Sequence, residues 1–155
     1  MMPFPSTRLP FKWNLWIAAR LLTIYARGRP LDEILRRATP DRGARAYADL
    51  TSEEIAAAVK AAVARPWRMR GRRCLREGLL AFHYMCLAGY KPVLHFGLVP
   101  KSALTTKPRA HCWINLDGKT VLNPAQEPML DLFSYDGQAK IPAQHAMRLA
   151  GMDHD

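Results

Sequence analysis

The chain has 155 residues, a length that favours one domain with a modest hydrophobic core. Hydrophobic residues make up 49% of it, which excludes an intrinsically disordered chain. Lysine and arginine number 23 against 13 acidic residues, and the net charge of +10 favours an acidic partner such as a peptide, a nucleic acid or a membrane surface.

Three cysteines occur without regular spacing: Cys74, Cys86 and Cys112. An odd number argues against a disulfide framework and favours a reducing compartment. The most apolar early run, residues 15–26, is interrupted by Arg20, is too short to cross a bilayer and has no convincing cleavage site after it. We therefore expect a cytoplasmic protein.

The first predicted element is a basic amphipathic helix that ends at Gly28. Basic residues are interspersed along it, and there is no acidic residue before Asp32. We expect its apolar stripe to pack on the core; docking to a partner protein or a membrane surface is the alternative. The stripe recurs at roughly helical spacing and consists of Trp13, Trp16, Ile17, Leu21 and Ile24.

Two more helices are predicted before residue 66. The first covers Leu31–Ala38, with Pro30 near its first turn. The second begins at Thr51, which forms a capping box with Glu54, and it stops before Pro66. Residues 1–65 are thus predicted to form a helical N-terminal region that packs on the core or docks a partner, while residues 66–155 form the core itself.

The second region predicts one long helix and a small antiparallel sheet, which is an α+β arrangement. The helix runs from Arg72 to Leu87 and closes at Gly89. A hairpin follows later, about Asp117-Gly118. Strands are predicted over residues 92–99, 110–116 and 119–123, whereas the sequence from residue 124 onward is weakly patterned.

Cys74 lies in the first turn of this long helix, where unpaired backbone N–H groups and the helix dipole favour an anion. Arg72, Arg73 and Arg76 add positive charge around it. Both effects lower the pKa of a thiol, and the thiolate is the nucleophilic form. The same N–H groups can stabilise an oxyanion, so we predict Cys74 as a nucleophile. Cys86 and Cys112 are interpreted as structural, Cys112 because it points away from the face of its neighbour His111.

His111 is the predicted base for Cys74. It heads a strand after a long loop, a position in which a catalytic base is easily exposed. Gly78 and Ala81 share roughly the helix face of Cys74 and leave room for a strand to approach. His95, in the middle of the preceding strand, remains an alternative.

A third group is expected to fix the imidazole tautomer. If residues 116–118 form a three-residue loop, His111 lies opposite Asn123, whose side-chain oxygen can accept the imidazole N–H. If the loop has two residues, His111 faces Pro124 instead. Asp117 is the second candidate, although an aspartate at a turn commonly serves the turn itself. We favour Asn123 and keep Asp117 open.

Two segments of the second region resemble a known family: RRCLREGLLAFHYMCLAGYKPVLHFGLV at residues 72–99 and AHCWINLDGK at residues 110–119. They resemble the transglutaminase-like cysteine peptidases that remove the leader from lasso-peptide precursors. The resemblance covers about half of the chain. It implies a papain/transglutaminase-like fold, with the catalytic cysteine at a helix N-terminus packed on a small antiparallel sheet.

The resemblance also implies an activity, that of a cysteine endopeptidase acting on a ribosomally synthesised precursor. Cys74 would be its nucleophile and His111 its base. The third residue of the family is an aspartate on the strand after the hairpin, where this chain has Asn123. No cofactor or metal is expected.

Partners are implied in the same way: the precursor peptide, a leader-recognition protein and an ATP-dependent macrolactam synthetase. Because residues 1–65 are predicted to be helical rather than a winged helix with a β-hairpin, the recognition protein is expected to be separate. The arginine cluster between Arg65 and Arg76 would face a partner or the precursor, or form a solvated surface. The residues expected to contact substrate are Trp67, Arg72, Arg73 and Trp113.

Other functions remain as alternatives. The charge and the interleaved aromatic and arginine residues suit a basic nucleic-acid- or partner-binding module without catalysis, but no nucleic-acid-binding motif is present and nucleic acid is not the expected partner. A zinc site formed by His83, Cys86, His111 and Cys112 is disfavoured because neighbouring strand residues point to opposite faces. The same fold could also serve a transferase or an inactive scaffold, since water or an amine can resolve an acyl-enzyme.

Overall fold

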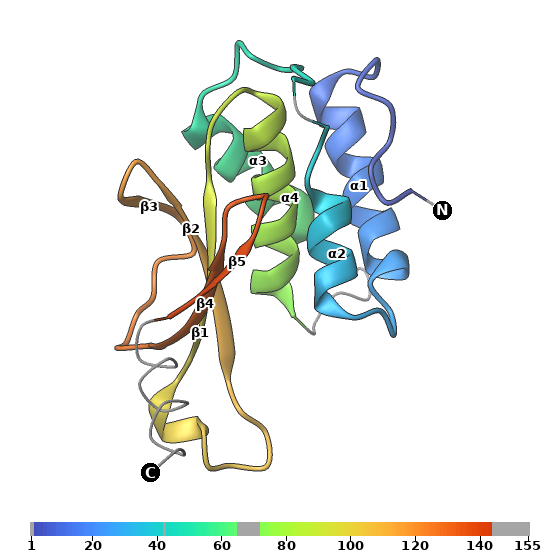
Figure 1. Cartoon of the computed structure of the whole chain (residues 1–155). Helices are drawn as coiled ribbons and strands as arrows, with labels where there is room; N and C mark the ends of the chain where they lie inside the picture. Colours follow the sequence, from blue (N-terminus) through green and yellow to red (C-terminus); the bar gives the residue numbers. More distant parts are fainter. Residues whose placement is uncertain (1, 42, 65–71, 144–155) are drawn as a thin grey trace.

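The computed structural model describes residues 2–41, 43–64 and 72–143 of the chain. Within these residues a layer of helices covers one face of a five-stranded antiparallel sheet (Figure 1). This is the α+β architecture expected from the sequence. Trp67, one of the expected substrate contacts, lies outside the described residues.

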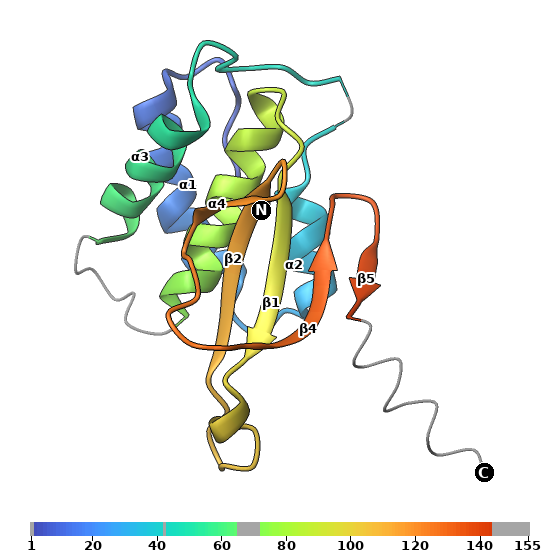
Figure 2. The ribbon, with the colours of Figure 1, turned by 90° about the vertical axis from the view of Figure 1, so that its left-hand side faces the viewer.

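The helices enclose α4, which lies directly against the sheet. Helices α1, α2 and α3 pack around it and share one hydrophobic core with it (Figure 2). As a result, every α4 side chain from Leu79 to Met85 is buried. The helices span Phe11–Tyr25 (α1), Leu31–Ala38 (α2), Ser52–Ala64 (α3) and Arg73–Leu87 (α4).

Local signals set the ends of the helices where the sequence predicted them. At the start of α3, the Thr51 N–H donates to Glu54 Oε2 at 2.8 Å, and the Glu54 N–H donates to Thr51 Oγ1 at 3.1 Å, which confirms the capping box. After α4, Gly89 adopts a positive φ of 95°, and its N–H donates to the Cys86 carbonyl at 3.0 Å. A glycine is favoured there because a Cβ would strain this left-handed conformation.

The sheet has the spatial order β3-β2-β1-β4-β5, with all neighbours antiparallel. A short 3-10 turn, η1 (Pro100–Ser102), lies in the loop between β1 and β2. The last two strands were not predicted, because their sequence alternates weakly; they form by pairing, β4 with β1 and β5 with β4. The strands span Val93–Leu98 (β1), Ala110–Leu116 (β2), Lys119–Leu122 (β3), Leu130–Tyr135 (β4) and Lys140–Pro142 (β5).

Helix α1 packs through a different face from the one predicted. The large apolar residues Trp13, Trp16 and Ile24 are 65%, 43% and 59% exposed. The buried face consists of Asn14, Leu15, Ala18, Ala19, Leu22 and Tyr25.

The reason is that α1 carries apolar residues on two faces, and the face with small residues packs more closely. Ala18 and Ala19 let the helix backbone approach its neighbours. The buried Asn14 is satisfied there, since it accepts a hydrogen bond from Tyr84 at 2.6 Å and donates to the Ser6 carbonyl at 2.8 Å. Of the helices in the described residues, none is both long and apolar enough to cross a membrane.

Candidate active site

Cys74 is the second residue of α4 and is half-buried. The residue before the helix, Arg72, has a left-handed backbone with φ 60°, and no described side chain caps this end of the helix. The first N–H groups of a helix have no partner within the helix. They therefore face the region around Cys74 as donors for an anion.

The pKa of the Cys74 thiol is lowered to about 5. The largest cause is a hydrogen bond from the Cys112 side chain; the Cys112 backbone N–H and the nearby His111 lower it further, whereas burial opposes them. The sequence interpretation had assigned this effect to the helix N-terminus and to the flanking arginines. In the structure Arg73 instead pairs with the buried carboxylate of Glu77 at 2.8 Å, which compensates its charge.

Cys112 is the residue of this site that the sequence interpretation missed. It is 2% exposed and lies on the face of β2 that packs on α4. Its Sγ lies 2.9 Å from the carbonyl oxygen of Cys74. The absence of a side chain at Gly78 permits this approach, because a Cβ there would lie 3.1 Å from that sulfur and 2.9 Å from Leu94. Cys112 is thus buried, as expected of a structural cysteine, and it also contacts Cys74, which was not expected.

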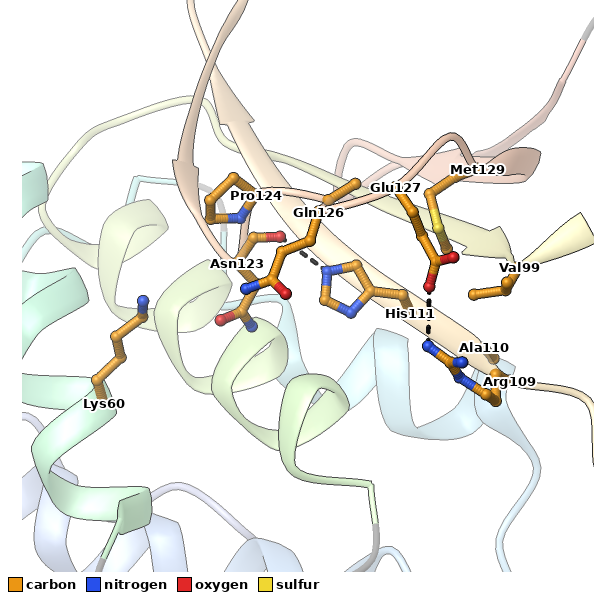
Figure 3. A pocket seen from close by; sticks show the side chains of 11 residues that line it. Lys60, Val99, Arg109, Ala110, His111, Asn123, Pro124, Gln126, Glu127 and Met129 are labelled. Carbon is orange, nitrogen blue, oxygen red and sulfur yellow. Dashed lines mark hydrogen bonds and ion pairs between the residues drawn. The ribbon is translucent and has the colours of Figure 1, made fainter.

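The structure brings His111 to Cys74, as predicted. It is the second residue of β2, and both its charge and a side-chain hydrogen bond act on the Cys74 thiol. On the other side of the ring, Nε2 lies 2.9 Å from the backbone carbonyl oxygen of Asn123 (Figure 3). A carbonyl only accepts, so Nε2 carries the hydrogen and Nδ1 is left to exchange a proton with Cys74.

Asn123 therefore orients His111 through its main chain and not through its side chain, which corrects the sequence hypothesis. The hairpin turn has two residues, Asp117 and Gly118, with φ of 50° and 79°, as in the tight turns that match strand twist. Leu116 therefore pairs with Lys119, and the prediction of a three-residue loop was wrong.

A bulge then shifts the register of β3 by one more residue, so that continued pairing would place Asn123 opposite Trp113, and only its carbonyl oxygen contacts His111. The pairing shifts between Ile114 and Asn115, where Val121 is the extra residue of β3. Asn123 follows with a left-handed φ of 51°, a conformation that asparagine tolerates better than most residues. Its amide nitrogen Nδ2 is buried and makes no hydrogen bond with the described residues.

Asp117, the second candidate for orienting His111, lies at the exposed tip of the hairpin. It lies six positions further along the chain than His111, an extended span of about 20 Å. The structure thus separates these two residues. His95, the alternative base, stacks on Trp113 with ring centroids 5.4 Å apart, and Trp113 in turn stacks beside His111 at 6.1 Å.

An open cleft of about 450 Å³ lies beside His111 and Asn123 (Figure 3). Lys60 reaches into it from α3, and no acidic side chain of the described residues pairs with it. On the opposite side Arg109 and Glu127 form an exposed ion pair of 2.8 Å. The cleft therefore offers an extended segment of chain a path past the imidazole.

The model of the transglutaminase-like superfamily matches residues 15–132, well over half of the chain. The chain belongs to the transglutaminase-like superfamily. Neither a curated protein nor a solved structure matched it. The matched segment contains Cys74, His111 and Asn123, and membership of this superfamily points to cysteine-protease-type catalysis.

Other titratable groups of this transglutaminase-like chain serve packing. Burial raises the pKa of Cys86 to about 12, and burial lowers the pKa of His83 to about 4. The His83 ring stacks on Phe4 with centroids 3.7 Å apart, and its Nδ1 bonds the Ala38 carbonyl at 3.0 Å. Within residues 2–41, 43–64 and 72–143, no group of three or more metal-ligating side chains is arranged around one point, so the four residues of the zinc alternative are not brought together.

Proposed function

We propose that this protein is a cysteine endopeptidase that removes the leader peptide from a ribosomally synthesised lasso-peptide precursor. One observation carries the catalytic part. A thiol with a pKa of about 5 lies at a helix N-terminus, and His111 contacts it with the ring fixed by the Asn123 carbonyl. At neutral pH such a pair holds a thiolate beside an imidazole that can carry its proton.

The chemistry proceeds in two halves. The Cys74 thiolate attacks the scissile carbonyl carbon and forms a C–S bond, while negative charge develops on the carbonyl oxygen. His111 gives a proton to the leaving amine as the C–N bond breaks. His111 then accepts a proton from water, the water oxygen attacks the thioester, and the C–S bond breaks to return the thiolate.

The donors suited to the oxyanion are the first N–H groups of α4, which lie around Cys74. Asn123 serves this site through its backbone carbonyl, which holds the His111 ring.

The substrate class rests on the sequence resemblance of residues 72–123 to lasso-peptide leader peptidases. The cleft is compatible with it because it is open to solvent and offers about 450 Å³ beside His111. Lys60 would favour an acidic or carbonyl-rich segment near the scissile bond. Arg72 and Trp113 are kept as substrate contacts, whereas Arg73 would have to leave Glu77 to take part.

A separate leader-recognition protein is the proposed partner of α1, and a macrolactam synthetase would act on the released core peptide. The outer face of α1, formed by Trp13, Trp16 and Ile24, is apolar and exposed. Arg20 stacks over Trp16, with its guanidinium carbon 3.5 Å from the ring centroid. Exposed tryptophans next to arginines are typical of protein-binding surfaces.

The decisive experiment presents the protein with lasso-type precursor peptides, each together with the recognition protein that binds its leader, and follows products by mass spectrometry. We expect cleavage between leader and core. Cys74→Ala should slow it by at least about a thousandfold, and His111→Ala by about a hundredfold to ten-thousandfold.

Cys86→Ala is the matched control, because it removes a thiol from the same helix without touching the site. Undiminished cleavage in Cys74→Ala would contradict the mechanism. A product in which an added primary amine replaces the leaving group, with no hydrolysis, would assign a transferase instead.

A further inference from the structure

We propose that Cys74 and Cys112 form a reversible disulfide when the protein meets a hydroperoxide, and that this bond is a redox switch on the active site. Its formation does not depend on the identity of the substrate. Only its consequence, the loss of the nucleophile, rests on the proposed peptidase function.

The geometry of the two cysteines carries the inference. The Cys112 side chain hydrogen-bonds the Cys74 thiol, and its Sγ also lies 2.9 Å from the Cys74 carbonyl oxygen. The two residues come from packed elements, α4 and β2, and the glycine at position 78 lets the strand residue contact the helix. A disulfide requires the two sulfurs to come to a bond length of about 2.05 Å, which in this proposal the side chains in contact across α4 and β2 reach.

Exposure divides the roles between the two sulfurs. Cys74 is half-buried beside His111 and is held largely as the thiolate, the form that hydroperoxides oxidise. Cys112 is 2% exposed, so oxidants in solution reach it poorly, but it lies in contact with whatever forms on Cys74. This is the arrangement of a peroxide-sensing cysteine with a resolving partner.

The chemistry balances with the hydroperoxide as the only oxidant. The Cys74 thiolate attacks the peroxide oxygen, the O–O bond breaks, and Cys74 sulfenic acid forms with the release of water or an alcohol. Cys112 loses its proton and attacks the sulfenic sulfur, the S–O bond breaks, and the departing hydroxide takes a proton to become water. Two thiols are oxidised and one peroxide is reduced.

The first step prepares the second. In the resting protein the pKa of Cys112 is raised well above its usual range by its hydrogen bond to Cys74, by burial, and by the negative charges of Cys74 and Glu77. Sulfenic acid at Cys74 is neutral, so the repulsion from Cys74 ends when Cys74 is oxidised, while burial and Glu77 still act. Cys112 therefore becomes easier to deprotonate at the moment its attack is needed.

The test treats the full-length protein with hydrogen peroxide, blocks free thiols with an alkylating agent, and measures the intact mass and the unreduced proteolytic fragments. The parent should lose two hydrogen atoms, keep one alkylated thiol at Cys86, and yield a fragment that joins Cys74 to Cys112. Dithiothreitol added before the alkylating agent should restore all three thiols. Cys86→Ala should form the same linked fragment.

Cys112→Ala should instead gain oxygen atoms on Cys74 that dithiothreitol does not remove. A parent protein that gains oxygen on Cys74 while Cys112 is still alkylated would overturn the inference, and so would a disulfide to Cys86. The result for the parent protein tests the disulfide by itself, even if the Cys112→Ala variant does not fold. The disulfide test uses no substrate, so its result is independent of the peptidase assay. A protein that forms the disulfide but cleaves no precursor would contradict the proposed function and support the redox switch. A protein that cleaves the precursor but forms no disulfide would support the function and contradict the switch.

Discussion

The two ends of α4 each carry a half-buried cysteine, yet the two thiols differ in their chemistry. At the N-terminal end, hydrogen bonds from Cys112 and the charge of His111 lower the pKa of Cys74 to about 5. At the C-terminal end, Cys86 has only burial acting on it, and its pKa rises to about 12. Partial burial therefore does not decide the state of a thiol here; the partners that stabilise its charged form do.

The largest expected effect is the difference in reactivity between these thiols. At pH 7 Cys74 is almost all thiolate and Cys86 almost all thiol. A thiolate of low pKa is intrinsically less nucleophilic, which offsets part of that difference, so iodoacetamide should label Cys74 about a hundred times faster than Cys86. The rate at Cys74 should rise through a midpoint near pH 5 and be flat above it.

Mass spectrometry of timed samples measures both rates in one protein. Cys74→Ala should abolish the fast labelling and Cys86→Ala should leave it unchanged. A Cys74 midpoint close to 8.5, the pKa of an ordinary thiol, would mean that the pair with His111 is not assembled in the isolated protein.

A smaller effect separates the two groups that lower the pKa of Cys74. Cys112→Ala should cut the alkylation rate at pH 5 by about tenfold, because a hydrogen bond to a charged group is worth about 1.5–3 kcal/mol. His111→Ala should raise the alkylation midpoint of Cys74 less than Cys112→Ala does, since Cys112 is the larger cause of the lowered pKa. Cys112→Ser, which keeps a donor, should recover part of the rate. If His111→Ala instead changed the alkylation of Cys74 more than Cys112→Ala does, His111 would be the larger cause of the low pKa.

The smallest effect is expected at Asn123. Asn123→Gly keeps the left-handed backbone and the carbonyl that accepts from His111, so the alkylation midpoint of Cys74 should stay where it is and the rate should change by less than about threefold. Asp117→Asn is the control at the distant turn and should behave like the parent. A rise in midpoint as large as that of His111→Ala would show that the Asn123 side chain orients the imidazole after all.

The local parts of this site were predictable because their signals lie within a few residues. The capping box at Thr51, the glycine that closes α4 and the tight turn at Asp117-Gly118 are all such signals, and each is present in the structure. The length of that turn was harder, since the same residues suit a loop of two or three. The packing face of α1 was predicted wrongly, because hydrophobicity alone does not tell a face of small residues that fits a neighbour from a face of large ones that stays exposed.

By itself the sequence determined the four helices and the first three strands of the described residues, together with the two principal groups, a cysteine at a helix N-terminus and a histidine at the head of a strand, since these follow from local patterning and composition. Only the tertiary structure decided what surrounds them. The contact of Cys112 with Cys74 depends on how β2 packs on α4 over Gly78, and the bond from His111 to the Asn123 carbonyl depends on where the chain leaves β3 beside β2. Both are non-local, and a shift of one residue in strand register would place each side chain on the opposite face of the sheet.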